Sequence, residues 1–464
     1  MKWETVIGLE VHAELSTKSK IFCVCSTGFG AEPNTHVCPV CVGMPGTLPK
    51  LNRAVVDYAL RLGLALGCNI NKQCRFDRKN YFYPDLPKAY QLSQLYQPIC
   101  TGGQVGKVRL HQIHMEEDAG KLLHDSRSGK TYMDYNRSGV PLLEIVSKPD
   151  LHSADEVIEY LSNLRETLLY LDICDCKMQE GSLRADVNLS VRPIGGELGT
   201  RTETKNLNSF KAISRAIEYE IERQIDVLED GGTITQETRR WDDDLGESYS
   251  MRSKADAQDY RYFPDPDLLP ISIDETWLEQ IRISLPELAH QKRERYVSFG
   301  ISDVDAGILT SHKNISDLFE LLHKKTDNTR ESSNLITGEI MRLIANPEDM
   351  QAIDTNKLSI LISLVTDGKI NRNAYKETVA EVLTNGVDPE AYVKEKGLLM
   401  IKDDAVVKTA VEAAIAANPK AVEEYKSGKD KAFQFLVGQS MRTLKGAGNP
   451  VAVKEVLENL LNSQ

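Results

Sequence analysis

The stretch VIGLEVHAEL, residues 6–15, is the strand pattern from which we infer the fold class. Apolar residues recur at every second position, namely Leu9, Val11, Ala13 and Leu15. The positions between them carry Glu10, His12 and Glu14. Because successive side chains of a strand point to opposite faces, this alternation predicts one buried apolar face and one open polar face. Such two-faced strands are typical of antiparallel sheets in α+β domains.

Similar patterns follow along the first 290 residues. Leu183–Arg192 alternates in the same way, and its outward positions carry Arg184, Asp186, Asn188 and Ser190. Helices are expected over residues 52–67, 153–171 and 209–228. The first has an Asn cap and a Gly stop, and the second opens with the capping box Ser153/Glu156. We therefore expect an α+β domain with an antiparallel sheet.

The composition of the chain changes near residue 290. Every Cys and Trp lies before that point, and the sequence beyond it is dominated by helical patterns such as SNLITGEIMRLIAN (333–346) and KLSILISLVTDG (357–368). A chain of 464 residues exceeds what one core usually supports. We expect three domains: residues 1–290 with the sheet, an all-α domain over 291–402, and a small helical tail over 403–464.

Composition and charge exclude several classes of protein. The net charge of −12 argues against a generally basic, nucleic-acid-coating surface, so any contact with RNA should come from local patches. No apolar stretch is long enough to span a bilayer, and no secretory or transit peptide pattern is present. Nine cysteines, an odd number, then indicate reduced thiols or metal ligands and a cytoplasmic location.

FCVCSTGFGAEPNTHVCPVC, residues 22–41, has the spacing of a metal site. Two close pairs, Cys23/Cys25 and Cys38/Cys41, are separated by a loop rich in turn residues. Each pair can span one edge of a tetrahedron, which predicts a four-cysteine zinc site within the first domain. Four thiolates close the coordination sphere, so the role would be structural. The alternatives are four thiols without metal, or His36 in place of one cysteine.

Carboxylates gather in a second set of motifs. HMEEDAGK, residues 114–121, places three acids side by side, and Glu144 lies in the apolar run GVPLLEIVS, residues 139–147. A carboxylate within such a run is costly to bury without a partner. Together with Glu10 and His12, Glu117 and Glu144 would form an oxygen-rich site suited to Mg²⁺ and nucleotide phosphates. The alternative is that each acid is a separate surface charge.

The segment CRFDRKNYFYPDLPKAYQLSQ, residues 74–94, interleaves cations with aromatic rings. Arg78, Lys79 and Lys88 could pair with phosphates while Tyr81 and its neighbours stack on a base. The alternative is a loop packed on the core. DYRYFPDPDLLP, residues 259–270, has the same character. We find no complete Walker, Rossmann, kinase, HExxH or GxSxG motif.

Together these motifs resemble a known family. ETVIGLEVHAEL (4–15), FDRKNYFYPDLPKAYQLSQ (76–94), HMEEDAGK, NRSGVPLLEIVS (136–147), EGSLRADVNLSVRP (180–193), KNLNSF (205–210) and DYRYFPDPD (259–267) follow one another in this order. The sequence is closely similar, over its whole length, to the B subunits of bacterial aspartyl/glutamyl-tRNA amidotransferases. The segment GKDKAFQFLVGQSMRTLKGAGNP, residues 428–450, looks like the tRNA-binding tail of that family.

The resemblance implies a cradle-shaped first domain related to glutamine-synthetase-like and guanidino-kinase folds. It implies ATP-dependent phosphorylation of the side-chain carboxylate of Glu-tRNA(Gln) or Asp-tRNA(Asn), followed by attack of ammonia. The ammonia would come from an amidase-type glutaminase subunit (A), and a small linker subunit (C) would join the two. Two other functions stay open: a self-contained ATP-dependent ligase or kinase for a small molecule, and a non-catalytic tRNA-binding scaffold.

The resemblance also implies roles for individual residues. Glu10, His12, Glu117 and Glu144 would be catalytic and hold Mg²⁺, with Glu116 and Asp118 supporting them. Residues expected to contact ATP are Arg78, Lys79, Tyr81, Lys88, Arg184, Asp186, Asn188, Lys205 and Asn206. Zinc would be held by Cys23, Cys25, Cys38 and Cys41. The tail cations expected to contact tRNA are Lys426, Lys429, Lys431, Arg442 and Lys445; the alternative for them is a solvated helix face, with Phe433, Phe435, Leu436, Val437 and Met441 packing the helix.

Overall fold

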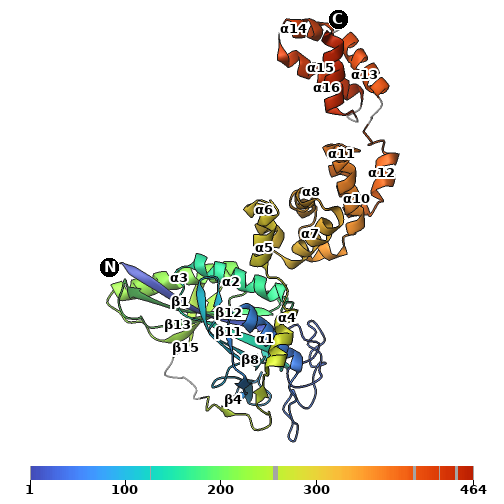
Figure 1. Cartoon of the computed structure of the whole chain (residues 1–464). Coiled ribbons are helices and arrows are strands. Elements are labelled where there is room, and N and C mark those ends of the chain that lie inside the picture. The colour runs from blue at the N-terminus through green and yellow to red at the C-terminus, as the bar shows by residue number, and fades with distance from the viewer. Residues whose placement is uncertain are drawn as a thin grey trace. The chain divides into compact units, whose positions relative to one another are not determined.

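The computed structural model describes residues 2–462 except 126, 254–259, 401–403, 428 and 445–447. The chain divides into two compact units, Met1–Ala289 and His290–Gln464, so the boundary expected near residue 290 is found. The further boundary expected at residues 402–403 lies outside the described residues. The fold is α+β, with a sheet-rich first unit and a helical second unit (Figure 1).

The first unit is built on a ten-stranded sheet with β1 (Trp3–Glu14) near its middle. The strand order is β15 (Glu247–Ser253), β14 (Glu237–Asp242), β13 (Thr202–Lys205), β12 (Leu183–Pro193), β1, β11 (Pro141–Ser147), β8 (Val108–Glu117), β6 (Cys100–Thr101) and β2 (Asn69–Ile70), with β7 (Gln104–Val105) paired to β8. The sheet was expected to be antiparallel, but β13 and β14 pair in parallel. The helix α3 (Phe210–Glu229) lies between these two strands in the chain and supplies the crossover that a parallel pair requires.

The alternation of β1 is confirmed. Ile7, Leu9, Val11 and Ala13 are fully buried, whereas Glu10, His12 and Glu14 lie on the opposite face. His12 is opposite Glu144 of β11 and Arg184 of β12. Glu10 is opposite Asp186 of β12. The register of three strands therefore gathers these polar side chains on the open face of the sheet.

Helices α1 (Arg53–Ala65), α2 (Ala154–Tyr170) and α3 pack with the apolar residues of β1 and β12 in one hydrophobic core (Figure 1). The two caps expected from the sequence are present: the side chains of Asn52 and Ser153 accept hydrogen bonds from the first turns of α1 and α2, and Ser209 caps α3 in the same way. The capping box differs in one detail. The Glu156 carboxylate accepts from the N–H of His152, at 2.6 Å, rather than from that of Ser153.

Smaller elements border the sheet. β4 (Asp77–Asn80) pairs with β5 (Tyr90–Ser93) and β16 (Phe263–Pro264), which brings the two aromatic-rich segments of the sequence together. β3 (Gln73–Cys74) pairs with β17 (Ile271–Ser272), next to α4 (Glu275–Ser284). β9 (Lys121–Asp125) and β10 (Lys130–Asp134) form a hairpin.

The second unit is helical and contains two separate hydrophobic clusters. The first cluster involves α5 (Ala289–Ser298), α6 (Asp303–Thr310), α7 (Lys313–Thr326), α10 (Thr355–Thr366), α11 (Arg372–Asn385) and α12 (Pro389–Glu395). Within it, the helix expected over 333–346 is interrupted, because Leu335–Ile340 forms a π-helical turn between α8 (Thr329–Asn334) and α9 (Met341–Leu343). The second cluster involves α13 (Asp404–Ala417), α14 (Pro419–Lys426), α15 (Asp430–Thr443) and α16 (Pro450–Asn462). Among the described helices, none has the length and apolar character needed to cross a bilayer.

Candidate active site

A cavity of about 830 Å³ opens on the polar face of the sheet. Strands β1, β8, β11, β12 and β13 contribute its acidic floor, and β4 contributes a lysine and a neighbouring tyrosine. The residues expected at the site that line this cavity are Glu10, His12, Lys79, Tyr81, Glu144, Arg184, Asp186, Lys205 and Asn206. Segments far apart in the sequence thus converge on one cavity.

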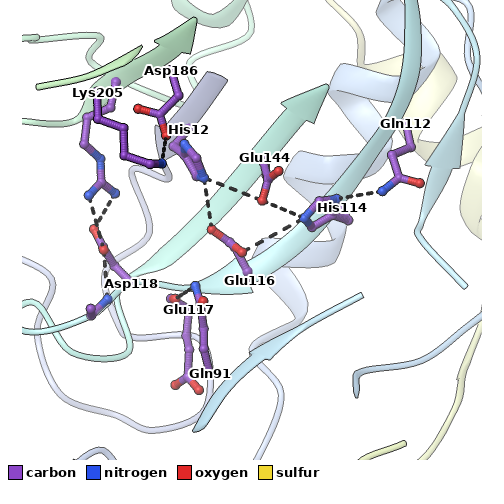
Figure 2. Close-up of polar contacts among 12 residues, drawn as sticks. His12, Gln91, Gln112, His114, Glu116, Glu117, Asp118, Glu144, Asp186 and Lys205 are labelled. Carbon is purple, nitrogen blue, oxygen red and sulfur yellow. Dashed lines mark hydrogen bonds and ion pairs between the residues drawn. The ribbon is translucent and has the colours of Figure 1, made fainter. Parts of the chain in front are cut away.

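The first acidic cluster consists of His12, Glu116 and Glu144, whose ligand atoms all lie within 4.8 Å of one another. His12 Nε2 lies 3.5 Å from both Glu116 Oε1 and Glu144 Oε2. His114 Nε2 lies 2.9 Å from Glu144 Oε2, so this second histidine orients the carboxylate (Figure 2). Two carboxylates and one imidazole form a donor set that suits a divalent cation.

Glu116 and Glu117, the two neighbouring glutamates of HMEEDAGK, point to opposite faces of β8. Figure 2 shows Glu116 pointing toward His12 and His114. Glu117 is the next residue of the same strand and therefore faces the other way. The sequence interpretation grouped Glu117 with His12 and Glu144, and the structure corrects that grouping, because Glu116 occupies the position that was expected for Glu117.

Glu117 is held by partners of its own. Its carboxylate is ion-paired with Lys88, with Nζ 2.6 Å from Oε2, and it accepts a hydrogen bond of 2.9 Å from the N–H of Leu92. Both side chains of the ion pair are largely buried. Lys88 was expected to contact ATP, but its charge is directed to Glu117 on the face of β8 away from the cavity.

A second acidic cluster lies beside the first and includes Glu10, two residues from His12 on β1. Glu10, Asp186 and Glu203 place their ligand atoms within 4.8 Å of one another. Glu10 was expected in the same set as His12, and the structure assigns it to this neighbouring set instead, because it lies opposite Asp186. Lys205 contacts Asp186 and lies 2.9 Å from Glu203 Oε1. Two adjacent clusters that could each hold a cation resemble the arrangement that phosphoryl-transfer sites with two metal ions use.

The pKa values of these groups reflect crowding of like charges. Burial lowers the pKa of His12, but the carboxylates of Glu144 and Glu116 together outweigh burial and raise the pKa to about 9. Burial and the Glu144 carboxylate raise the pKa of Glu10 and of Glu116. The acids thus lie where added positive charge is favourable, and a bound cation would stabilise all of them as carboxylates.

Two cations face the acidic floor. Among the described residues, no carboxylate lies within ion-pairing distance of Lys79; its Nζ lies 5.0 Å from the ring centre of Tyr260 and 5.8 Å from that of Tyr81. Burial disfavours its charge, but Tyr262 and Glu116 outweigh that effect and raise the pKa of Lys79. Arg184 is different, because its guanidinium donates to Asp118 at 2.6 Å. Lys79 is therefore a cation available to an anionic ligand.

Two more of the expected ATP contacts, besides Lys88, do not line the cavity. Arg78 donates to Asp265 at 2.6 Å and to Asp267 at 2.9 Å, and its guanidinium lies over the ring of Tyr90. It joins the two aromatic-rich segments to each other and does not line the cavity. Asn188 donates to Glu10 at 3.0 Å and lines a second, smaller hollow.

Sequence reasoning missed His114 and Glu203. His114 was visible in HMEEDAGK, and its spacing of two from Glu116 predicts the same strand face. Glu203 lies in TETK with the same spacing from Lys205, but the strand is short and no motif marks it. The spacing of two was the available signal in both cases.

The four cysteines of residues 22–41 come together as expected. The Sγ atoms of Cys23, Cys25, Cys38 and Cys41 lie within 4.8 Å of one another, a limit that accommodates the separation of about 3.8 Å that Zn–S bonds of about 2.3 Å give in a tetrahedron. The fully buried Lys20 places its Nζ 3.6 Å from Cys41 Sγ. A hydrogen bond with Cys23 and the charge of Lys20 lower the pKa of Cys41. A thiolate beside a buried cation fits a closed tetrathiolate zinc site.

We expect one zinc ion per chain. Loss of a residue that only hydrogen-bonds to a metal ligand lowers metal affinity roughly 10–100-fold, and Cys38→Ser, which removes a ligand itself, should lower zinc affinity by more than that. Because a closed zinc site stabilises the fold and leaves no position for a substrate, Cys38→Ser should clearly lower the thermal midpoint and have a smaller effect on the catalytic rate. Elemental analysis and thermal unfolding measure the two effects. Cys68→Ser, a half-buried cysteine outside the cluster, is the control and should retain zinc. Wild-type protein without zinc after growth in zinc-replete medium would contradict the assignment.

The tail cations lie on the surface of the last helices. Lys426, Lys429, Lys431 and Arg442 are exposed, and Lys445 lies outside the described residues. Lys429 lies 3.2 Å from Glu424, which reduces the local positive charge. Phe435 was expected to pack the helix but is 48% exposed, because it shares a face of α15 with Lys431 and Arg442 at spacings of four and seven residues. Leu436 and Val437 are buried as expected.

Comparisons with known proteins agree with this architecture. The family model of the GatB/GatE catalytic domain matches residues 5–279, and that of the GatB domain matches residues 317–461. The chain is 55% identical over 475 residues to the B subunit of the aspartyl/glutamyl-tRNA(Asn/Gln) amidotransferase of Lachnoclostridium phytofermentans, covering 99% of both chains. It is 55% identical to the protein of the same name from Caldicellulosiruptor bescii, again over 99% of both chains, and 52% identical to that from Thermoanaerobacter pseudethanolicus over the full length of both. The chain therefore belongs to the family of B subunits of aspartyl/glutamyl-tRNA(Asn/Gln) amidotransferases, whose catalytic domain contains the cavity described above.

Proposed function

We propose that this chain converts Glu-tRNA(Gln) to Gln-tRNA(Gln), Asp-tRNA(Asn) to Asn-tRNA(Asn), or both, by ATP-dependent activation of the side-chain carboxylate. The observation that carries the proposal is the pair of acidic clusters on the floor of one cavity, faced by Lys79, with which no described carboxylate pairs. Both reactants of such a phosphoryl transfer are anionic, so the site must supply positive charge between them.

We assign a separate role in this reaction to each group of residues in the cavity. His12, Glu116 and Glu144 would hold one Mg²⁺, and Glu10, Asp186 and Glu203 a second. Bound there, Mg²⁺ would neutralise phosphate charge and align the two reactants. Lys79 would bind the transferring phosphoryl group, and Arg184, fixed by Asp118, would orient the substrate carboxylate. His114 keeps the Glu144 carboxylate in place.

The reaction proceeds in two balanced steps. An oxygen of the side-chain carboxylate attacks the γ-phosphorus of ATP, the bond to the bridging oxygen breaks, and ADP leaves. Ammonia then attacks the acyl carbon of the mixed anhydride, the C–O bond to phosphate breaks, and the amide and inorganic phosphate form. The sequence offers no credible nucleophile unit for glutamine hydrolysis, which supports an amidase-type partner as the ammonia source, joined through a small third subunit.

The open polar face of the sheet also supports the expected relationship to the cradle folds of glutamine-synthetase-like and guanidino-kinase enzymes. Against a non-catalytic scaffold, we note that carboxylates repel RNA, so two acidic clusters in a cavity are unsuited to RNA binding alone. Against a small-molecule ligase, the exposed face of α15 with Phe435 between two cations suits a nucleic acid.

The tail contacts lead to a prediction. Lys431→Gln combined with Arg442→Gln should raise the KM for Glu-tRNA(Gln) and flatten the salt dependence of binding by about one to two units of log–log slope, because two phosphate contacts are lost. The core of the tail excludes both side chains, so the fold should persist. Lys394→Gln with Lys396→Gln, at the C-terminal end of α12, removes the same charge elsewhere and is the matched control. Equal salt slopes for the two double variants would refute the role of α15.

The experiment that tests the function is ATP turnover by the purified chain with its partner subunits, with and without Glu-tRNA(Gln). We expect turnover of ATP that requires both the charged tRNA and Mg²⁺. Turnover stimulated by a free amino acid instead would support the small-molecule ligase, and no turnover in any mixture would support the scaffold.

A further inference from the structure

The segment YRYFPDPD, residues 260–267, has no part in the chemistry assigned above. It contains β16, which pairs with β4 in a small sheet that is separate from the ten-stranded one. Tyr260, at the start of the segment, lines the main cavity. β4 carries Lys79, the cation that faces the acidic floor. The segment therefore borders the lysine to which the proposed function gives the phosphoryl group.

Two tyrosine rings approach the ammonium group of Lys79. Its Nζ lies 5.0 Å from the ring centre of Tyr260 and 5.8 Å from that of Tyr81. These two rings meet edge to face, with their centres 5.7 Å apart and their planes at 71°. A third ring, that of Tyr262, meets Tyr260 in the same manner at 6.0 Å. An ammonium within about 6 Å of a ring centre is attracted by the face of the ring, so Lys79 is held by aromatic side chains.

The neighbour of Lys79 in β4 fixes the position of the Tyr260 ring. The Asn80 N–H donates to the carbonyl oxygen of Tyr260 at 2.9 Å, and Asn80 Nδ2 donates to that of Arg261 at 2.8 Å. Arg261 has a φ of 45°, in the left-handed region that residues other than glycine rarely adopt. Strained backbone of this kind persists where surrounding contacts hold it, and it is concentrated at functional sites. β4 thus carries both the lysine and the residue that holds the ring beside it.

Aromatic rings hold a cation without neutralising it. Lys88 and Lys205 are held by carboxylates, which compete with any anionic ligand for the ammonium group. Among the residues that the structure describes, no carboxylate lies within ion-pairing distance of Lys79. A ring carries a quadrupole but no net charge, so it restrains the lysine and leaves its charge for a phosphoryl group.

We propose that Tyr260 is a positioning residue for phosphoryl transfer, whose ring, together with that of Tyr81, holds the Lys79 ammonium group over the acidic floor of the cavity. The proposal rests on the function proposed above, in which Lys79 binds the transferring phosphoryl group. A lysine has a long, flexible side chain, and a ring that restricts it lowers the entropy lost when the transition state forms. Tyr260 acts through Lys79 and contacts neither reactant.

The test compares variants of Tyr260 in the assembled amidotransferase, with saturating ammonium chloride in place of glutamine so that delivery of ammonia does not limit the rate. Tyr260→Leu removes the ring, and we expect kcat for amidation to fall about tenfold. Tyr260→Phe keeps the ring and should retain most of the activity. Tyr132→Leu, which removes an exposed tyrosine of β10, is the control and should leave kcat unchanged.

A double-mutant cycle with Lys79→Met separates positioning from a role in folding alone. Without the ammonium group, Tyr260→Leu should lower kcat by less than about a further twofold. Asn80→Leu removes the side-chain hydrogen bond to residue 261 and leaves the ring in place. It should lower kcat in part, again only when Lys79 is present.

An unchanged kcat for Tyr260→Leu would overturn the positioning role. An equal loss from Tyr260→Leu with and without the Lys79 ammonium group would overturn it as well, because the ring would then act independently of the lysine. If the wild-type complex forms no Gln-tRNA(Gln) from ATP and ammonium, the proposed function itself fails.

Discussion

Replacement of Glu116 with glutamine is expected to lower the rate of tRNA amidation by about 10²–10³-fold. Glu116 contributes one of the two carboxylates of the first acidic cluster, and an amide in its place is a weaker ligand for a hard cation. The Mg²⁺ concentration for half-maximal activity should rise, while glutamine hydrolysis by the partner subunit should stay nearly constant. Steady-state amidation across a Mg²⁺ titration measures both effects.

Two other substitutions serve as controls for Glu116→Gln. Glu159→Gln on the exposed side of α2 should have no effect. Glu117→Gln breaks the ion pair with Lys88 on the other face of β8, and whatever it does to the maximal rate, it should leave the half-saturating Mg²⁺ concentration unchanged. If Glu117→Gln shifted that concentration and Glu116→Gln did not, the assignment of the two neighbours would be reversed.

Lys79→Met is the second change with a large expected effect. Methionine keeps the apolar part of the side chain but removes the charge that faces the transferring phosphoryl group, a type of loss that costs about 10²–10³-fold in kcat. We expect kcat for ATP-dependent amidation to fall by about that factor. Lys79→Arg should recover part of the rate, because it restores the charge without the geometry.

The control for Lys79 is Lys107→Met, an exposed lysine in the β7–β8 turn. Thermal midpoints should be similar for the two variants, because, among the described residues, no carboxylate pairs with Lys79. An unchanged kcat for Lys79→Met at saturating ATP and Mg²⁺ would remove Lys79 from the proposed chemistry.

Much of the fold could be predicted from strand and helix periodicity. The alternation of β1 and β12 predicted which side chains face the core, and the caps Asn52 and Ser153 located two helices. The cysteine spacing predicted the four-cysteine cluster, because such ligands are close in sequence as well as in space. These are local features, and local physics determines them.

The errors concern pairing between distant segments. Sequence alone identified HMEEDAG as acidic but could not tell which of two adjacent glutamates faces β1, since one residue of register exchanges the faces of a strand. Sequence alone also could not show that Glu10 and His12 belong to different clusters. They point to the same face of β1, but they meet different partners on the neighbouring strands. Arg78 had two acidic partners in a segment almost 190 residues away, and no sequence pattern indicated that pairing.

The central claim is that this chain phosphorylates the side-chain carboxylate of a misacylated tRNA. It is tested most directly with Glu-tRNA(Gln) labelled with ¹⁸O in the side-chain carboxylate, converted by the complete amidotransferase with ATP, Mg²⁺ and glutamine. The acyl-phosphate route transfers one carboxylate oxygen to phosphate, so mass spectrometry should find one ¹⁸O in each inorganic phosphate released per Gln-tRNA formed. Phosphate without ¹⁸O, accompanied by normal formation of Gln-tRNA, would contradict the account.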